Sequence, residues 1–590
     1  MARQLISRQR IPKGIVQRIA RHLGALPARR VTWGLVALFS LWALLDVFVF
    51  KLSGGLAKSS FDAMVRARVH AASPDPRIVI IDIDEATLAR MAPDFGRWPW
   101  PRDTLATVLA YLERQQPAAV VWDVLFSDAD RLSPGGDAAF NEAARRSTHS
   151  HFSVVRLPQA IDASSQITRA ALPGLWLADG PPRLLPLIVP THPATASPGA
   201  ATVPATVALI APVLPAVAAS RLGFNNGYVD PDGVLRRYRY LEPLADGSAI
   251  QSLALSVMGA VNTANNIANY SIGTTGSGIF DGRNELIAWR KNSHAYPRVP
   301  LADVFAQAEG AKPVGRVPGF AGKVVIIGST APSLHDIHPT PLSPTMAGVD
   351  SLATALDNGL NQRRLRELPP IVQAGLAIAL CVGLALWVQF KSAASLAPAL
   401  LALPAALLGI SYLSLNGLPV FLDLHVAAGV ALAFLAVLRV WSSLRRKHWC
   451  SLPKEGPQGP VPLAVWAWER QGPWLEAPLD RLIDAIERHA PQCRVVVCDA
   501  RVTWPSTLRW PELARFCAVV GPHAAVRAAQ TSLAPARGRL ALRWGEPVWL
   551  NIGADREKLA NDVMGAWSAL QKTATSGDRA PAKMGLTLEA

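Results

Sequence analysis

The sequence predicts a membrane protein with an α/β exported domain, a four-helix transmembrane region and a small α/β cytoplasmic domain. Of its 590 residues, 50% are hydrophobic and only 17% are charged, which is too apolar for an ordinary soluble domain. Four apolar runs are long enough to span a bilayer, and about 320 residues of mixed character separate the first run from the others. The length therefore leaves room for folded domains beside the spans.

Each apolar run holds about 20 residues, which matches a hydrocarbon core at a helical rise of about 1.5 Å per residue. The predicted spans are residues 31–50, 371–390, 395–415 and 418–438. Very short connections separate the last three, so we expect these to form antiparallel helices. The remaining predicted parts are a basic N-terminus, an exported domain, a cytoplasmic domain and a disordered tail, at residues 1–30, 51–370, 439–572 and 573–590.

The basic side chains predict that both ends of the chain are cytoplasmic. Residues 1–30 hold eight basic residues and no acid, and the predicted inside carries thirteen basic residues near the spans against five outside. Residues 51–370 would then be exported, and their lack of cysteine agrees with the oxidising outer face of a bacterial inner membrane. A cleaved signal peptide is the alternative for the first span, but the apolar run is longer than a usual signal core.

The net charge of +16 is concentrated beside the spans. Anionic lipid headgroups would attract these side chains on the cytoplasmic face. The basic composition therefore gives little support for nucleic-acid binding.

Residues 51–370 contain the buried strands and amphipathic helices that are typical of an α/β fold. The predicted strands are residues 77–84, 118–126 and 322–330, and the predicted helices are residues 85–91, 104–114 and 348–360. The first strand, its helices and the second strand imply a parallel pair joined by a right-handed crossover.

Two further segments of this block carry turn or loop signals. A Pro-Asp-Gly turn within residues 227–240 predicts a hairpin. Residues 174–215 are rich in proline, alanine and threonine and predict a loop or insertion with little regular structure.

Six segments of the block, in this order, resemble the extracellular sensory domain of bacterial receptors called CHASE, type two. They read IVIIDIDEATL, GRWPWPRDTLATVL, AAVVWDVLFSD, GYVDPDGVLRRYRY, FAGKVVIIGSTAPSLHDIHPTPL and AGVDSLATAL. The resemblance covers most of residues 51–360 and implies an α/β exported sensor domain between an anchor and three closing spans. It also implies a cytoplasmic output module such as a nucleotide cyclase or kinase. The chain departs from the family pattern at Asp350, Ser351 and Leu352 and in its Pro-rich insert.

Polar side chains gather at the predicted strand ends, where open α/β sheets place ligand sites. Gly328 ends the third strand. Arg102, at the end of the Trp-Pro-Trp-Pro-Arg run, and the pair Arg236 and Arg237, after the predicted turn, could reach the strand-end carboxylates. The candidate ligand-binding residues are Asp82, Asp84, Trp98, Arg102, Asp123, Arg236, Arg237 and Asp336. Two interpretations remain open: a polar pocket with tryptophan walls, or a buried ion-pair network that fixes the loops.

A few other polar residues are weaker candidates. His335, Asp336 and His338 suit zinc by residue type but lack further partners, and the resemblance carries over only Asp336. We therefore expect no metal and no cofactor. Asp46, Asp423 and His425 are costly in hydrocarbon and so are functional candidates, although the last two lie near the outer end of a span, where water can solvate them.

The tail beyond residue 438 reads as a small α/β domain. Predicted strands are residues 462–468, 494–499, 539–544 and 548–551, the last two as a hairpin around Gly-Glu-Pro, and predicted helices are residues 479–489 and 555–572. The tail contains no phosphate-binding loop, kinase loop, diguanylate signature or cyclase metal-aspartate pair.

The sequence therefore favours a non-enzymatic transmembrane receptor with a periplasmic sensor domain. Its expected partners are a small-molecule ligand or an envelope protein outside, a cytoplasmic signalling partner, and a second copy in a homodimer. A cryptic signalling enzyme, such as a diverged nucleotide cyclase, and a scaffold of an envelope assembly are the alternatives.

Overall fold

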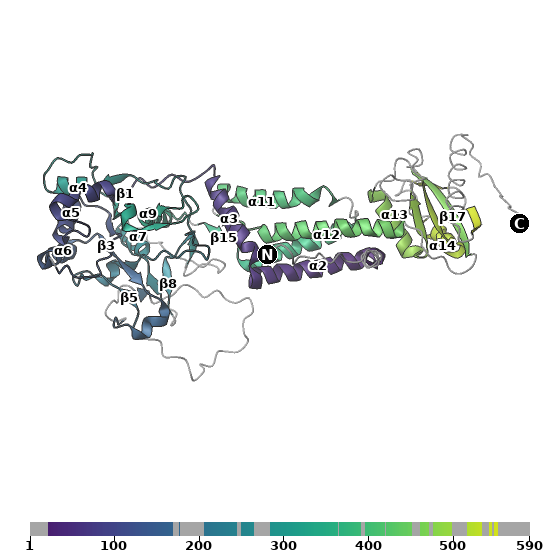
Figure 1. Cartoon of the computed structure of the whole chain (residues 1–590), viewed down its shortest axis with the longest axis horizontal. Coiled ribbons are helices and arrows are strands. Elements are labelled where there is room, and N and C mark those ends of the chain that lie inside the picture. The colour runs from purple at the N-terminus through teal and green to yellow at the C-terminus, as the bar shows by residue number, and fades with distance from the viewer. Residues whose placement is uncertain are drawn as a thin grey trace, which may run out of the picture. The chain divides into compact units, whose positions relative to one another are not determined.

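The structure is a computed structural model. It describes residues 22–131, 133–168, 176–177, 206–244, 249–264, 284–363, 365–390, 396–418, 420–450, 461–470, 476–497, 516–533, 542–544 and 548–552. The chain divides into two compact units (Figure 1). The first unit comprises Met1–Ser53, Pro370–Leu408 and Leu424–Ala590, and the second comprises Gly54–Pro369 and Gly409–Asp423.

The second unit is built on a seven-stranded sheet in the order β11-β1-β12-β2-β3, with β5 and β6 both pairing with β3. All pairs are parallel except that between β3 and β5. The strands are β1 (Ile78–Ile83), β2 (Ala119–Trp122), β3 (Ser150–Arg156), β5 (Leu209–Ile210), β6 (Leu222–Phe224), β11 (Arg298–Pro300) and β12 (Val324–Ser329).

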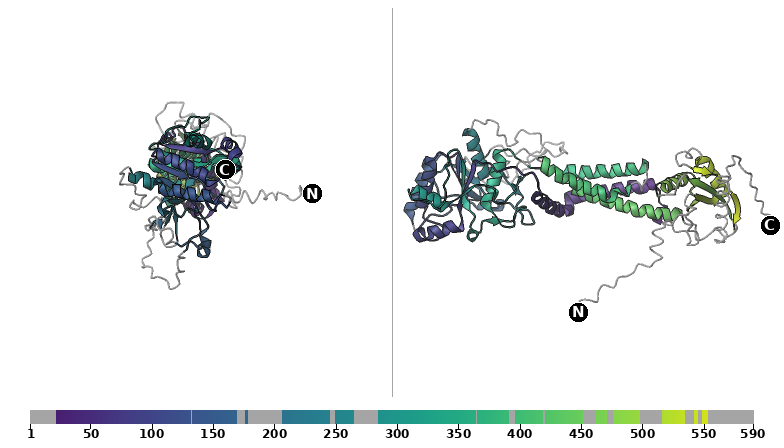
Figure 2. Two further views of the ribbon diagram at one scale, coloured as in Figure 1. Left: turned by 90° about the vertical axis from the view of Figure 1, so that its left-hand side faces the viewer. Right: turned by 90° about the horizontal axis from the view of Figure 1, so that it is seen from above.

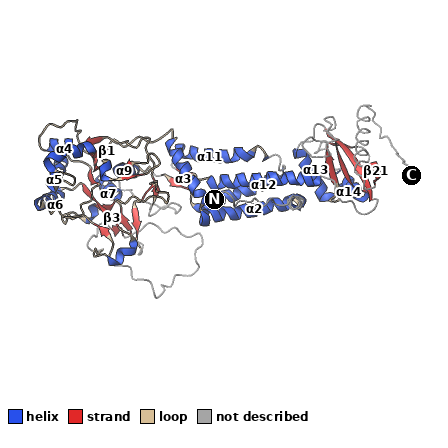
Figure 3. Ribbon diagram, viewed as in Figure 1, coloured by secondary structure: helices blue, strands red, loops and turns tan. Residues whose placement is uncertain are grey.

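Alternate side chains of the central strands face two separate hydrophobic cores, and helices cover both faces of the sheet (Figures 2 and 3). Ile78 and Ile80 of β1 pack in one core, and Val79 and Ile81 pack in the other. The first core also receives α3 (Leu52–Arg66), α7 (Leu253–Ala264) and α9 (Gly348–Leu360). The second receives α4 (Glu85–Phe95), α5 (Arg102–Arg114), α6 (Pro134–Arg146) and α8 (Leu301–Ala308). Burial on both faces explains why these strands are almost uninterrupted β-branched runs.

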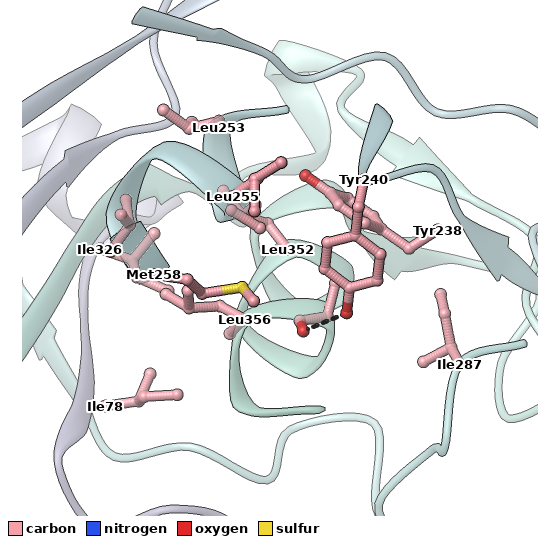
Figure 4. Packing of buried hydrophobic residues seen from close by; sticks show 14 of the residues in the cluster. Ile78, Tyr238, Tyr240, Leu253, Leu255, Met258, Ile287, Ile326, Leu352 and Leu356 are labelled. Carbon is pink, nitrogen blue, oxygen red and sulfur yellow. Dashed lines mark hydrogen bonds between the residues drawn. The ribbon is translucent and has the colours of Figure 1, made fainter. Parts of the chain in front are cut away.

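In the first core, the hydroxyl of Tyr240 donates a hydrogen bond of 2.7 Å to the carbonyl of Ala355 (Figure 4). Its ring lies among aliphatic side chains of α7 and α9, so the one polar atom of this side chain is satisfied inside the core.

The predicted strands and helices of this unit are present, but two predictions about pairing are wrong. β1 and β2 are parallel but not neighbours, because β12 lies between them. The turn at Gly233 forms, with φ of 80°, but its flanks do not make a hairpin. β7 (Arg237–Tyr238) pairs instead with β10 (Glu285–Leu286). An alternating pattern indicates a strand but does not specify its partner.

The Pro-rich segment carries two short strands among its described residues. β4 (Trp176–Leu177) pairs with β9 (Ala249–Gln251), which also pairs with β8 (Leu241–Pro243), and β5 lies on the main sheet. Residues 174–175 and 178–205 of the predicted loop lie outside the described residues.

Among the described residues, four helices are long and apolar enough to cross a membrane. They are α2 (Ala28–Leu45) with its continuation η1 (Asp46–Phe50), α10 (Pro370–Phe390), α11 (Ala399–Gly417) and α12 (His425–Trp449). In the first unit α2, α10 and α12 pack side by side (Figures 1 and 2). Their shared core includes Cys381, Val430 and Phe434.

The fourth predicted span, residues 418–438, is misplaced. Before α12 begins, β16 (Val420–Phe421) pairs in parallel with β15 (Arg366–Glu367). α12 then continues to Trp449. The basic residues that we expected to follow the span therefore lie within the helix. Hydropathy does not separate a short apolar strand from the start of a helix, which explains the error.

Asp46, a candidate for function in the first span, has a structural role. Its carboxylate accepts hydrogen bonds from the backbone amides of Leu52 (2.9 Å) and Ser53 (3.3 Å) and from the hydroxyl of Ser53. Lys51, with φ of 53°, makes the turn between the two helices. Asp46 therefore caps the N-terminus of α3.

The described residues of the C-terminal part of the first unit form an antiparallel sheet in the order β18-β19-β17-β20, with β21 also on β17, together with two helices. The elements are β17 (Val461–Arg470), α13 (Glu476–His489), β18 (Arg494–Val497), β19 (Phe516–Pro522), α14 (His523–Leu533), β20 (Leu542–Trp544) and β21 (Val548–Ile552). As predicted, one face of α13 is buried through Leu479, Leu482, Ile483 and Ile486.

The predicted hairpin in this part is wrong. β20 and β21 both pair antiparallel with β17, at Trp468↔Trp544 and Val465↔Val548. β17 is long enough to pair with the two segments in succession, so β20 and β21 pair with it and not with each other. The predicted helix at residues 555–572, the tail at 573–590 and the basic residues 1–21 lie outside the described residues.

Candidate functional site

Asp82 lies at the carboxyl end of β1 and is 5% exposed. Its carboxylate accepts hydrogen bonds from the amide (3.1 Å) and the hydroxyl (2.8 Å) of Thr330, which follows β12. Nη1 of Arg298 lies 3.4 Å from Oδ2 of Asp82, because β11 pairs with β1 at the Arg298 position. Burial raises the pKa of Asp82, although Thr330 and Arg298 oppose this shift.

The same guanidinium binds a second buried carboxylate, Asp350, in the first turn of α9. Nη2 of Arg298 lies 2.5 Å from Oδ1 of Asp350, and Nδ1 of His294 lies 3.3 Å from Oδ2. Asp350 is 0% exposed, and burial raises its pKa. Sequence reasoning noted Asp350 only as a departure from a family pattern and missed Arg298, since β11 is too short to show a strand pattern.

Asp123 follows β2 at the same edge of the sheet. Its Oδ1 accepts a hydrogen bond from the side-chain amide of Asn225, and its Oδ2 is buried without a hydrogen-bond partner among the described residues. Burial and the neighbouring charge of Asp336 raise the pKa of Asp123 to about 8. Burial also raises the pKa of Asp336, whose Oδ1 lies 3.6 Å from Nε2 of His338.

Two glycines let these side chains approach the backbone. A Cβ atom on Gly348 would lie 2.4 Å from Oδ2 of Asp336. A Cβ atom on Gly328 would lie 2.8 Å from Cγ2 of Val349 and 3.1 Å from Cβ of Asp123. No side chain fits at either position without displacing its neighbours.

The other predicted site residues lie elsewhere. Asp84 caps α4 by accepting a 2.7 Å hydrogen bond from the amide of Thr87. The ring of Trp98 packs edge-to-face on Trp100 with centroids 4.9 Å apart. We call Asp82, Asp123, Asp336, Asp350 and Arg298 the strand-end site. Within the described structure, neither Asp84 nor Trp98 binds its carboxylates.

The expectation that Arg102 reaches the strand-end carboxylates is wrong. It binds Asp137 at 2.6 Å and donates to the carbonyl of Asp128. The reason is that α5 begins at Arg102 beside the start of α6, so the first turn of one helix meets the first turn of the other.

Arg236 and Arg237 also bind other carboxylates than expected. We call their surroundings the arginine cluster, which comprises Asp62, Asp230, Asp232, Arg236, Arg237 and Glu367. Both arginines lie at β7, outside the main sheet, so they face α3 and the turn rather than the ends of β1 and β2. The candidate residues thus divide between one strand-end site and separate structural ion pairs.

No group of three metal-binding side chains occurs in the part of the chain that the structure describes. The strand-end site instead brings together four carboxylates with raised pKa values and one guanidinium. Such a site is suited to binding protons or a cationic group.

The family model of the CHASE2 domain matches residues 34–387. The chain belongs to the CHASE2 domain family. The match covers more than half of the chain and confirms the resemblance found in the sequence. No curated protein and no solved structure matches the chain.

The CHASE2 domain of this chain includes the whole parallel sheet, the strand-end site and the arginine cluster. It begins within α2 and ends within α10, so the family match contains most of the first two candidate spans as well as the α/β domain. CHASE2 is a sensory domain family, which supports a role in sensing a signal.

Proposed function

We propose that this CHASE2 protein is a non-enzymatic transmembrane receptor, which senses a signal with residues 51–370 and relays it to a C-terminal α/β domain that acts on a cytoplasmic signalling partner. The observation that carries the proposal is the arginine cluster. It joins the segment that leaves the first span to the segment that enters the second.

The contacts of the arginine cluster connect three parts of the domain. Arg236 is 2% exposed and binds Asp62 of α3 at 2.7 Å, and it also binds both aspartates of the turn. Arg237 binds Glu367 of β15 at 2.7 Å. α3 follows the first span, and β15 precedes α10. A displacement of β7 would therefore be transmitted to both segments that connect the domain to the membrane.

The far end of the relay is the junction of α12 with α13. Arg445 binds Asp484 at 2.7 Å and also binds Glu487, and Arg446 lies 3.2 Å from the carboxylate of Asp480. α12 runs without a break from its apolar part to Trp449, which packs in the core of the C-terminal domain. A movement of α12 would therefore be passed directly to α13.

We further propose a bacterial inner membrane, with residues 51–370 periplasmic and both termini cytoplasmic. The asymmetry of basic residues supports this orientation. So does the packing of the segment before α2 on the end of α12, where the indole of Trp441 donates a 3.1 Å hydrogen bond to the carbonyl of Leu23. A Cβ atom on Gly24 would lie 2.7 Å from the carbonyl oxygen of Leu444, and this close packing supports a location of both flanking segments on the same side of the membrane.

Cysteine labelling tests the orientation. Cysteines introduced at residues 5 and 580 should stay protected from an impermeant thiol reagent in intact spheroplasts, and one at residue 180 should react. Labelling at residue 580 without labelling at residue 180 would exclude the receptor topology.

Hydrogen exchange tests the relay. In the full chain in lipid nanodiscs, Arg237→Gln removes the contact with Glu367 and should change the exchange of α13, whereas Arg145→Gln, at an exposed pair with Glu142, should not. Unchanged exchange in α13 for both variants would contradict the relay.

The non-enzymatic part of the proposal needs its own test. The full chain incubated with nucleoside triphosphates should form no product, and turnover would favour a cryptic enzyme. Stoichiometric co-purification of envelope proteins from mild detergent, together with an unresponsive α13, would favour a scaffold.

A further inference from the structure

We propose that the signal is acidity, and that Asp82 and Asp350 at the strand-end site take up the proton that starts the response. The inference rests on the proposed receptor function and names the signal for that receptor. Its basis is an imbalance of charge that is built into the buried end of the sheet.

Two buried carboxylates share one guanidinium at this site. Asp350 is fully buried, Asp82 is nearly so, and Arg298 contacts both, at 2.5 Å and 3.4 Å. Asp84 adds a further negative charge near Asp82. When both carboxylates are ionised, one negative charge is left uncompensated inside the protein, which is costly.

One oxygen of Asp350 lacks a hydrogen-bond donor in the described structure. Nη2 of Arg298 lies 3.0 Å from Nδ1 of His294. Because a guanidinium only donates, the imidazole nitrogen accepts in the neutral tautomer that makes this bond. In that tautomer it cannot also donate to Oδ2 of Asp350, although the two atoms lie 3.3 Å apart.

A proton on Oδ2 of Asp350 resolves both problems. The protonated oxygen becomes a donor, and Nδ1 of His294, at 3.3 Å, can accept its hydrogen in place of the one from Nη2 of Arg298. The imidazole side chain is 64% exposed, so the proton has a short path from solvent. The burial that raises the pKa of both carboxylates supports proton uptake at this site.

Protonation would change how α9 is held. The charge-assisted bond from Arg298 to Asp350 ties the first turn of α9 to β11, and it weakens when Asp350 is neutral. The chain runs from α9 into β15, whose Glu367 belongs to the arginine cluster. Proton uptake at the sheet edge is thus connected to the segment that enters the second span.

Infrared difference spectroscopy of the full chain in lipid nanodiscs tests the proposal directly. As the pH is lowered from about 8 to about 5, where exposed carboxylates stay mostly ionised, a carbonyl band of protonated carboxyl groups should grow. Asp82→Asn and Asp350→Asn should each reduce it. Because Asp123, Asp336 and Asp480 also have raised pKa values, the difference from the wild type is the quantity measured.

Asp303→Asn is the matched control. Asp303 is also buried and arginine-paired, with Arg90 at 2.7 Å. Although burial opposes ionisation, Arg90 and the amides of Val314 and Gly315 lower its pKa. The band should therefore be unchanged in this variant.

Several outcomes decide the matter. If the carbonyl band that grows as the pH is lowered is unchanged in both Asp82→Asn and Asp350→Asn, the proposal is wrong. A wild type without such a band also overturns it, a result that needs no variant to fold. Loss of the response in His294→Gln with retention in Asp350→Asn would transfer the role to the imidazole and also overturn it. Proton uptake that loosens α9 but leaves α13 unchanged would support acid sensing while contradicting the receptor relay.

Discussion

Arg102 binds the carboxylate of Asp137 at 2.6 Å, in a pair whose side chains are 12% and 22% exposed. The pair joins the first turn of α5 to the first turn of α6, and the guanidinium also lies 5.5 Å from the centroid of the Phe126 ring. Its role is therefore structural, although the WPWPR motif suggested a site.

Arg102→Ala should lower the opening free energy of α6 by about 1.5–3 kcal/mol, because it leaves a half-buried carboxylate without its cation. Hydrogen exchange of the full chain measures this. Arg97→Ala removes an exposed arginine and should change it by less than about 0.5 kcal/mol. Equal effects of the two variants would show that the pair with Asp137 does not stabilise α6.

Asp123→Asn should stabilise β2 at alkaline pH. Burial and Asp336 raise the pKa of Asp123 to about 8, so between this value and the ordinary carboxyl pKa near about 4 the folded state binds more protons than the unfolded state. Stability contributed by this group therefore falls as the pH rises through that window. At about pH 8 the variant should exceed the wild type by roughly 1–3 kcal/mol in the opening free energy of β2, and the gain should shrink toward about pH 5. A pH-independent difference would argue against a buried, titrating carboxyl.

Arg236→Met should be among the most damaging substitutions near the membrane. It leaves the carboxylates of Asp62, Asp230 and Asp232 without their shared cation, at a cost of about 3–5 kcal/mol in the opening free energy of α3. Arg145→Met breaks an exposed pair with Glu142 and should cost under about 0.5 kcal/mol. Similar exchange rates of α3 in both variants would show that the arginine cluster does not hold α3, and would so contradict its role in the relay.

Charge reversal tests the junction of α12 with α13. Arg446→Asp should repel Asp480 and expose Cys450, which is buried in the core of the C-terminal domain. Its alkylation rate should rise by about tenfold or more, corresponding to about 1.4 kcal/mol. Adding Asp480→Arg should restore protection. A double variant that labels as fast as the single one would show that the pair does not hold the helices together.

The sequence predicted what depends on local patterns. β1, β2, β12 and α9 were found because β-branched runs and helical periodicity are strong signals over short windows. Asp82 and Asp123 were placed correctly because the carboxyl ends of parallel strands share one edge.

The rest of the site depends on neighbours that are distant in sequence. Arg298 sits in a strand of three residues, and its two carboxylate partners become its neighbours only through the order of β11, β1 and the start of α9. Arg102 was assigned to the wrong carboxylates because the direction of a side chain in the first turn of a helix depends on which helix packs beside it. Neither relationship leaves a periodic signal in the sequence.

The cap that Asp46 provides restricts how this protein can be cut and recombined. Because the last turn of the first span supplies the hydrogen-bond acceptor for the first turn of α3, residues 46–53 behave as one indivisible joint. A chimaera that grafts this sensor onto a foreign anchor should therefore place its junction before Asp46. A fusion made at residue 51 would leave the first amides of α3 without a cap. These amides lie at the joint between the foreign anchor and the sensor, where the direction of α3 is set.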